Sequence, residues 1–150
     1  MMKYLHLSDF NTLTLLFQLQ KQSYAQEAKQ IHFYDIPPLK ESIEDLRRSD
    51  EIFVGYMQQQ EILGAISYKV NKGVLDIHRL MVHPNHMRKG IAQALISFIL
   101  QQKKVVLVAT PQKNTPAVNL YVKMGFVKTY SEIVAADLQM QHFRFEPQKV

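Results

Sequence analysis

The chain has no cysteine among its 150 residues. That absence excludes a disulfide-stapled scaffold, a catalytic thiolate and a zinc site built on cysteine. The sequence also lacks any run near the ~20 consecutive apolar residues that a membrane-spanning helix needs. Its first residues, Met-Met-Lys-Tyr-Leu-His-Leu, do not form the long apolar stretch of a secretory signal. We therefore expect a cytoplasmic protein with no membrane association.

Two common phosphate-binding motifs are missing as well. The sequence contains neither the G-x-x-x-x-G-K-[ST] loop of P-loop proteins nor the G-x-G-x-x-G fingerprint of dinucleotide folds. The formal net charge of +5 would suit a nucleic-acid-binding domain, but the lysines and arginines are scattered, without a basic run or an aromatic-basic platform. We expect no nucleic-acid partner, because a smaller polyanion explains the excess charge more simply.

The remaining composition is that of an ordinary globular domain. Hydrophobic residues make up 47% of the chain and charged residues 21%, and the length is enough for one domain, 1–150, with a buried core. The hydrophobic pattern predicts helices over 9–22, 39–48, 90–100 and 115–124, with a loop over 24–38. It predicts strands near 3–7, 51–57, 62–70, 74–82, 105–109, 126–134 and 138–145. We therefore expect a mixed α/β fold with its ligand site at the carboxyl end of a central strand.

The segment 114–126, Asn-Thr-Pro-Ala-Val-Asn-Leu-Tyr-Val-Lys-Met-Gly-Phe, has the pattern of a short amphipathic helix. Thr115 can cap its start, and Pro116 fits a first turn that needs no backbone donor. Gly125 can take the left-handed conformation that closes it. One face is apolar at i, i+3, i+4 and i+7, through Ala117, Leu120, Tyr121 and Met124. The helix would hold one tyrosine, Tyr121, in a defined place.

A second segment has the order strand, basic turn, helix. The strand 74–82 ends at His-Pro-Asn, and a dense apolar helix follows from Gly90. The first N–H groups of a helix have no internal partner, and the helix dipole adds positive charge there. Gly90 and Ala92 would let an anion approach the backbone closely, and Arg88 and Lys89 would add charge. This segment therefore predicts a phosphate cradle.

The cradle segment 87–92, Met-Arg-Lys-Gly-Ile-Ala, resembles the pyrophosphate loop [QR]-x-x-G-x-[GA] of the GCN5-related N-acetyltransferase (GNAT) superfamily. It departs from that pattern at Met87, where Gln or Arg is usual. The preceding Leu-Met-Val-His-Pro and the later Asn-x-x-Ala-x-x-x-Tyr-x-x-x-Gly-Phe are similar to the family's cofactor strand and second block, in the same order and spacing. The chain thus resembles a small bacterial GNAT protein, close over about 62–127. The resemblance implies a single-domain GNAT-like fold with a mixed central β-sheet flanked by helices.

The resemblance also implies a reaction: direct attack of a primary amine on acetyl-CoA in a ternary complex, with no covalent enzyme intermediate. We expect no metal, because His78, His83 and His86 straddle a strand and a turn and do not have the spacing of a metal site. The resemblance places Tyr121 near the thioester sulfur as the proton donor to the leaving thiolate, which suits a phenol with an ordinary pKa of ~10. The residues that it implies for the cofactor are Leu80, Met81, Val82, Met87, Arg88, Lys89, Gly90, Ile91, Ala92, Gln93, Asn114, Ala117 and Tyr121.

The attacking amine must lose a proton, and two residues are candidates for accepting it. Asp76 and His78 have equal parity on the strand 74–82 and should point to the same face. Asp76 stands where many relatives have a glutamate that serves as the general base. His78 has an unperturbed pKa that is more suitable for accepting a proton at neutral pH. The structural alternative is that Asp76 pairs with Arg79 or Lys69 and that His78 fills a half-buried site.

In this family the N-terminal helices and their loop surround the acceptor amine. The loop predicted here offers the aromatic residues Tyr24, Phe33 and Tyr34 as substrate contacts, with Glu27 and Asp35 among them, a combination that suits a cationic amine. The acceptor can be a small molecule or a peptide amine, and a homodimer is an open alternative for assembly. The rival hypothesis is a non-catalytic acyl-CoA-binding or partner-binding module on the same fold. The presence of Tyr121 argues against it, since mere cofactor binding does not need a phenol there.

Overall fold

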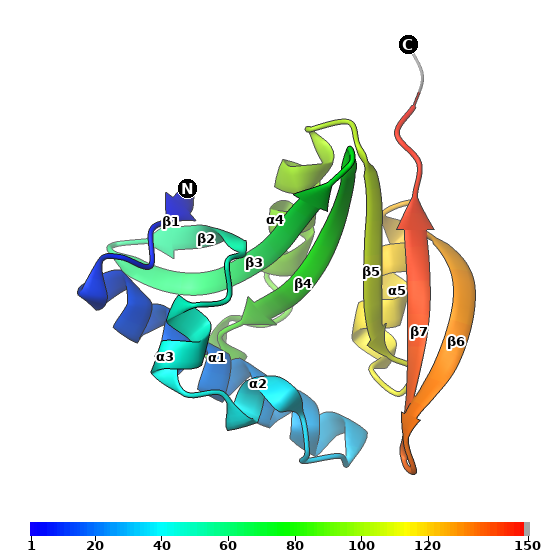
Figure 1. Ribbon diagram of the computed structural model, residues 1–150, viewed down its shortest axis with the longest axis horizontal. Helices are drawn as coiled ribbons and strands as arrows, with labels where there is room; N and C mark the ends of the chain where they lie inside the picture. The colour runs from blue at the N-terminus through cyan, green and yellow to red at the C-terminus, as the bar shows by residue number, and fades with distance from the viewer. Residues whose placement is uncertain (149–150) are drawn as a thin grey trace.

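The computed structural model describes residues 1–148 and has a seven-stranded mixed sheet in the order β1-β2-β3-β4-β5-β7-β6 (Figure 1). The strands are β1 (Met2–Leu5), β2 (Ile52–Gln58), β3 (Glu61–Asn71), β4 (Val74–Val82), β5 (Val105–Pro111), β6 (Val127–Ala135) and β7 (Leu138–Phe145). The helices are α1 (Phe10–Ile31), α2 (Pro37–Lys40), α3 (Ile43–Arg47), α4 (Ile91–Leu100) and α5 (Thr115–Lys123), with a 3₁₀ turn η1 (Pro84–His86). Within residues 1–148, no helix is long and apolar enough to cross a membrane. The expected single-domain α/β fold with a mixed central sheet flanked by helices is confirmed.

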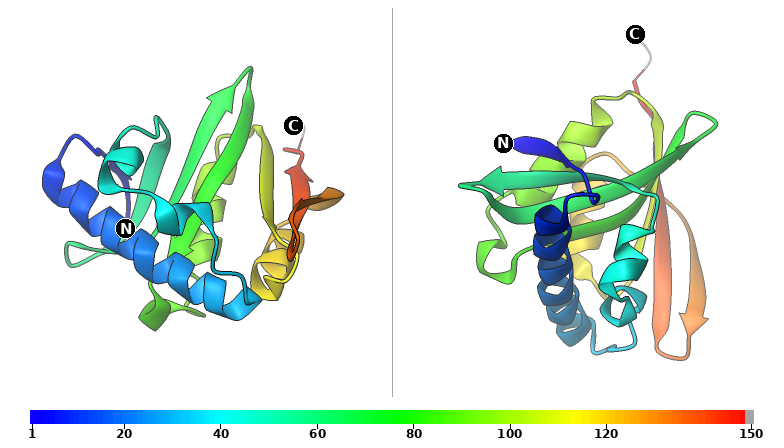
Figure 2. Two further views of the ribbon diagram at one scale, coloured as in Figure 1. Left: turned by 60° about the horizontal axis from the view of Figure 1, so that its bottom comes forward. Right: turned by 60° about the vertical axis from the view of Figure 1, so that its left-hand side comes forward.

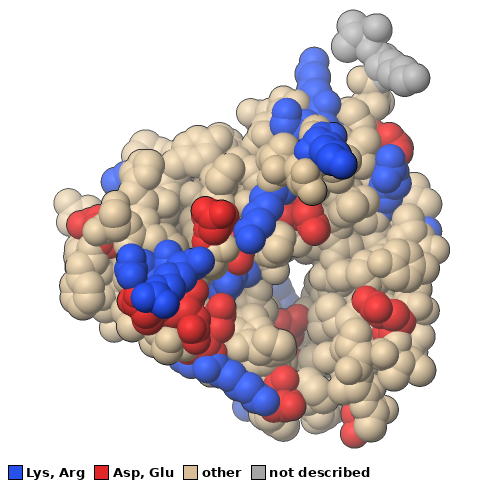
Figure 3. Space-filling model, in the orientation of Figure 1, with Lys and Arg blue, Asp and Glu red and all other residues tan. Residues whose placement is uncertain are grey.

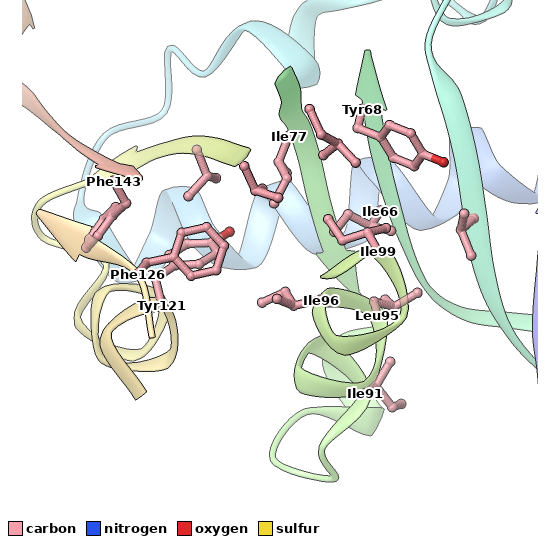
Figure 4. Packing of buried hydrophobic residues seen from close by; sticks show 14 of the residues in the cluster. Ile66, Tyr68, Ile77, Ile91, Leu95, Ile96, Ile99, Tyr121, Phe126 and Phe143 are labelled. Carbon is pink, nitrogen blue, oxygen red and sulfur yellow. The ribbon is translucent and has the colours of Figure 1, made fainter. Parts of the chain in front are cut away.

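The sheet separates two hydrophobic cores because alternate strand residues face opposite sides. On β2, for example, Val54 packs into the core beneath α4 and α5, whereas Phe53 packs into the core beneath α1 and α3. Figure 4 shows Leu95, Ile96 and Ile99 of α4 pointing toward the strands. The views in Figure 2 show α1 crossing the face of the sheet opposite α4.

The two central strands β4 and β5 are parallel but stay together only at their beginnings. Their pairing covers Val74–Asp76 against Val105–Leu107 and then stops. Beyond that point β4 continues beside β3, while β5 continues beside β7. A gap therefore opens in the sheet at the carboxyl ends of β4 and β5, as the diverging ribbons in Figure 1 show.

Two predictions about the N-terminal third were wrong. The first helix does not end near residue 22 but runs to Ile31, so most of the predicted loop 24–38 is helical. Residues 21–30 look polar, yet Tyr24, Ala28 and Ile31 continue the buried stripe of α1 without a glycine or proline. The predicted helix 39–48 is two short helices, because Ser42 forms a capping box with Asp45 and starts a new helix there.

The turn between β3 and β4 and the end of α5 agree with the sequence pattern, whereas the predicted cap of α5 was wrong. Lys72 and Gly73 have φ of 51° and 78°, the left-handed pair of a tight hairpin between β3 and β4. Gly125 closes α5 with φ of 97°, as predicted. The cap of α5 is Asn114 and not Thr115, because the Asn114 side chain accepts a hydrogen bond from the Ala117 N–H.

Candidate functional site

The gap between β4 and β5 contains a cavity of about 230 Å³. Its walls come from α1 and the segment 36–38 on one side of the sheet, from β4, β5 and β7, and from α5 on the other side. Figure 3 shows a hollow near the centre of this face, where the ribbons of β4 and β5 lie apart in Figure 1. Because both sides of the sheet contribute, a molecule in the cavity can contact both layers of helices.

The edge of β4 that borders the gap has backbone groups that are not paired with a neighbouring strand, because β4 pairs with β5 only over Val74–Asp76. His83 N–H donates to Leu63 O at 2.8 Å, toward β3, whereas Val82 N–H points the other way and donates to Ser23 Oγ at 3.1 Å. Successive residues of an extended strand alternate in this direction, so Leu80 faces the gap as Val82 does. The side chain of Met81 is buried against the core on the α1 side, and its main-chain groups point toward β3 as those of His83 do, so Met81 does not offer a polar group to the gap.

The segment predicted to be a phosphate cradle lies at the beginning of α4, after the carboxyl end of β4. Gly90 is the N-cap with φ of 81°, and a β-carbon added to it would meet no atom within 4 Å. Arg88 has φ of 64°, so two nearby residues turn the backbone in the left-handed sense just before α4, whose first N–H groups have no partner within the helix. The geometry fits a phosphate bound by backbone N–H groups.

Charged and polar side chains surround this cradle. Lys89 Nζ lies 3.3 Å from His86 Nδ1, and Lys123 Nζ on α5 donates to Gln93 Oε1 on α4 at 3.4 Å. Met87 is partly exposed beside them, and the neighbouring Ala92 is half-buried. Ile91 differs from these neighbours, because its side chain is buried and its Cγ2 fills the space above Gly64.

Tyr121 lies at the end of the cavity nearest α5. Its ring is 97% buried and packs against Phe126 and Phe143, with ring centroids 5.3 and 5.4 Å away (Figure 4). Burial raises the pKa of Tyr121 above its ordinary value, and the nearby Glu27 carboxylate raises it further. The phenol therefore keeps its proton at neutral pH.

Asn114 and Glu27 form a polar pair that joins the two layers of helices. Asn114 Nδ2 at the start of α5 donates to Glu27 Oε1 of α1 at 2.8 Å. Burial raises the pKa of Glu27, and the hydrogen bond from Asn114 partly opposes that effect. Glu27 reaches the cavity only because α1 extends past residue 22, which is why the sequence pattern did not place it beside Tyr121.

Comparison with known proteins identifies the family. The family described as "Acetyltransferase (GNAT) domain" matches residues 19–147. The chain belongs to the GNAT acetyltransferase family. It is 36% identical over 137 residues to UPF0157 protein YqkA of Bacillus subtilis (strain 168). That match covers 89% of this chain but only 40% of YqkA, so the chain described here spans less than half the length of this relative.

Solved structures show the same fold at low sequence identity. The ribosomal-protein-S18-alanine N-acetyltransferase of Escherichia coli matches with a TM-score of 0.79 and 12% identity, over 100% of this chain and 95% of that one. The PaiA N-acetyltransferase of Thermoplasma acidophilum, solved with coenzyme A, matches with a TM-score of 0.73 and 17% identity, over 99% of both chains. At these identities the likeness extends to the GNAT fold and not to the substrate.

The two candidate bases of the GNAT chain lie together but differ in their access to the cavity. His78 Nε2 is 3.9 Å from Asp76 Oδ2, and His78 Nδ1 is 3.9 Å from Glu51 Oε2. His78 is an extra residue in β4, since Arg79 pairs with Ser67 while Ile77 pairs with Tyr68. The bulge directs His78 into the cavity wall, whereas Asp76 is exposed and outside it.

Of the three aromatic residues predicted to contact the acceptor, the structure brings one to the cavity. Tyr24 lines it from α1 and is buried, which raises the pKa of its phenol. Phe33 packs against the core on the α1 side, and Tyr34 is 65% exposed. Their expected place is taken by the segment 36–38, Ile-Pro-Pro.

A buried charge network centred on Arg79 lies beside the cavity and was not predicted from the sequence. Arg79 is 8% exposed, and its Nε and Nη2 donate to Glu51 Oε1 and Oε2 at 2.9 and 3.0 Å. It also donates to Glu41 and to Gln20 Oε1. Arg79 therefore pairs with these residues and not with Asp76. The one sequence feature that could have indicated this network is an arginine within the mostly apolar strand 74–82.

Proposed function

We propose that this protein is an acetyl-CoA-dependent N-acetyltransferase that moves the acetyl group directly to a primary amine in a ternary complex. The proposal depends most on one observation: the cavity lies where β4 and β5 diverge, and the helix start proposed to bind phosphate follows the carboxyl end of β4. An extended cofactor arm can then enter the gap from the cradle, and an amine can reach it from the α1 side. Direct transfer needs this meeting of two substrates in one space.

The cofactor would be held mainly by backbone groups. Arg88, Lys89 and the first N–H groups after Gly90 would bind its phosphates. Its arm would lie along β4 at Leu80–Val82, in the manner of an added strand, with Asn114 and Ala117 on its other side. A β4 N–H in the gap would polarise the thioester carbonyl and stabilise its oxyanion.

The chemistry would then need one proton donor and one acceptor. Tyr121 is protonated, lines the cavity and would donate to the thiolate as it leaves. His78 and Asp76 remain candidates for the general base that accepts the proton of the amine. The position of His78 in the cavity wall favours it over Asp76.

The alternative, a non-catalytic module that binds acyl-CoA or a partner, makes a different prediction. A binding module should not accelerate release of free CoA from acetyl-CoA, with or without an amine. The protonated Tyr121 at the end of the cavity favours the enzyme, because binding alone gives a buried phenol no role there.

The first test is cofactor binding. A ligand at 100 times its dissociation constant stabilises a fold by about 2.7 kcal/mol, which for a domain of this size raises Tm by roughly 5–10 °C. We expect such a shift with millimolar acetyl-CoA in a thermal melt. Free CoA should then appear with at least one member of a panel of amines. No shift in Tm would contradict the cofactor, and a shift without CoA release on any amine would favour the binding module.

A further inference from the structure

Glu27 is half-buried, like Glu41 and Glu51, but differs from these two carboxylates in having no cation beside it. Glu51 and Glu41 share Arg79. Over residues 1–148, Glu27 has no lysine, arginine or histidine nitrogen within ion-pair distance, and its one hydrogen bond is the 2.8 Å contact from Asn114 Nδ2. A carboxylate out of water without a cation is costly. A cationic ligand in the cavity would supply the missing charge.

The walls of the cavity around Glu27 are mainly apolar. Ile31 and Ile36 lie on the α1 side, and Leu138 and Met140 of β7 lie opposite. The whole space is about 230 Å³, and part of it must receive the acetyl group. A ligand that fits it has a short apolar body and one charged end.

Glu27 also lies close to the expected reaction centre. Its charge acts on Tyr121, the candidate proton donor, and its hydrogen-bond partner Asn114 begins the helix that holds Tyr121. A nitrogen bound at Glu27 would therefore sit next to the thioester whose sulfur Tyr121 would protonate.

We propose that Glu27 binds the ammonium group of the acceptor and takes its proton, and that the acceptor is a small primary amine with a short apolar body. This inference rests on the proposed function, since it concerns the amine of that same reaction. It gives Glu27 the base role for which the sequence offered Asp76 and His78. The ordinary pKa of an alkylammonium group, ~10.4, makes such a proton acceptor necessary at neutral pH.

The protons and bonds of this step balance. The ammonium first gives one proton to the Glu27 carboxylate, and the freed nitrogen lone pair attacks the thioester carbonyl carbon. As the C–S bond breaks, the thiolate takes the Tyr121 proton. The nitrogen then loses a second proton, which restores Tyr121. The products are the amide and CoA thiol, and Glu27 passes its proton to solvent.

The surroundings of Glu27 suit this role. Tyr24 of α1 and Tyr121 of α5 face it as neutral phenols, and His78 and Arg79 border the same cavity from β4. Burial raises the pKa of Glu27 toward neutrality. A base whose pKa is nearer the working pH transfers protons more effectively than an ordinary carboxylate.

The binding half of the proposal is tested without the cofactor. Protein labelled with ¹³C at the glutamate carboxyls is titrated by NMR, and Glu27→Gln assigns the Glu27 signal. Benzylamine, butylamine and phenethylamine serve as probes, with benzyl alcohol as the neutral counterpart. At least one amine should lower the pKa of Glu27, because an ammonium favours the carboxylate, and benzyl alcohol should not. If none of the three amines moves it, the proposal is overturned.

The catalytic half uses the amine that gives the fastest CoA release. Glu27→Gln keeps an oxygen for Asn114, so it should lower kcat/KM for that amine by about 100-fold, with partial recovery at high pH where solvent supplies neutral amine. Asp50→Asn, which removes one exposed carboxylate, should match the wild type. Affinity for acetyl-CoA should stay within about twofold in both variants. A Glu27→Gln enzyme with wild-type kcat/KM would overturn the base role. Failure of the proposed function would differ, because the wild type itself would then not bind acetyl-CoA.

Discussion

At the scale of single residues, Tyr121 has the most specific expected role. Phe126 and Phe143 hold its ring, and the described residues give its hydroxyl no hydrogen-bond acceptor. Burial raises its pKa, so the phenol stays protonated throughout the pH range in which an enzyme would work. A phenol with a raised pKa is a weaker acid than the thiol that forms, so its proton transfer to the departing thiolate must be coupled to the return of a proton from the amine nitrogen.

We expect Tyr121→Phe to lower kcat by about 100-fold or more and to leave the Kd of acetyl-CoA nearly unchanged, because the substitution deletes one proton donor and keeps the ring. Steady-state kinetics and calorimetric titration measure the two quantities. Tyr130→Phe is the matched control, since it removes an exposed hydroxyl on β6. In the wild type, no loss of kcat up to about pH 10 should arise from Tyr121 ionisation, because its pKa is raised above the ordinary ~10. Turnover by Tyr121→Phe at the wild-type rate would reduce the residue to packing.

At the scale of elements, the beginning of α4 and the hairpin between β3 and β4 offer a matched pair of glycines. Gly90 and Gly73 have φ of 81° and 78°, and a β-carbon on either meets no atom within 4 Å. A side chain at either position therefore causes the same kind of backbone strain, about 1–2 kcal/mol, without a clash in the folded protein. Only Gly90 lies at the phosphate cradle.

We expect Gly90→Trp to abolish the stabilisation by acetyl-CoA, because the indole would cover the N–H groups that face the phosphates. Gly73→Trp should lose a similar amount of stability and keep the full cofactor shift. Thermal melts of both variants with and without acetyl-CoA separate the two effects. Equal cofactor shifts in the two variants would show that the phosphates bind elsewhere.

At the scale of the whole molecule, the Arg79 network ties the N-terminal helices to the sheet. Arg79 of β4 is joined to Gln20 of α1, to Glu41 between α2 and α3, and to Glu51, which also accepts from Ser67 Oγ of β3 at 2.6 Å. Burial alone would raise the pKa of Glu51, but hydrogen bonds from Arg79 and Ser67 outweigh it and hold that pKa below its ordinary value. The wall of the cavity formed by α1 and 36–38 depends on this network.

We expect Arg79→Met to cost about 3–5 kcal/mol at pH 7, because it leaves the Glu51 carboxylate buried without its cation. Arg48→Met, which removes a mostly exposed ion pair with Glu44, should cost under about 1 kcal/mol. A carboxyl whose pKa is lower in the folded state contributes stability above its unfolded pKa and loses it as the pH falls through the folded value. Wild-type stability should therefore fall below about pH 4, and the penalty of Arg79→Met should shrink there. Urea unfolding between pH 3 and 7 measures the free energy of unfolding of the wild type and of Arg79→Met. A difference between the two proteins that is as large at pH 3 as at pH 7 would contradict the assigned role of Glu51.

Much of the architecture is local and could be predicted from sequence patterns. The strand 74–82, the Lys72-Gly73 turn, the Gly125 closure and the Gly90 helix each depend on a few adjacent residues whose backbone preferences decide the conformation. The end of α1 could not be predicted this way, since its last turns are polar and become helical because Tyr24, Ala28 and Ile31 find a core to cover.

The sequence by itself determined the family motifs, the glycine turn before α4 and the helix that carries Tyr121, because each is a short run of neighbours. Only the tertiary structure decided which side chains meet in the cavity. Glu27 and Asn114 are 87 residues apart and come together through the long α1 and the split between β4 and β5. Arg79 likewise finds Gln20, 59 residues away, only when the sheet and α1 pack together. Such contacts depend on the packing of distant elements, which no local pattern encodes.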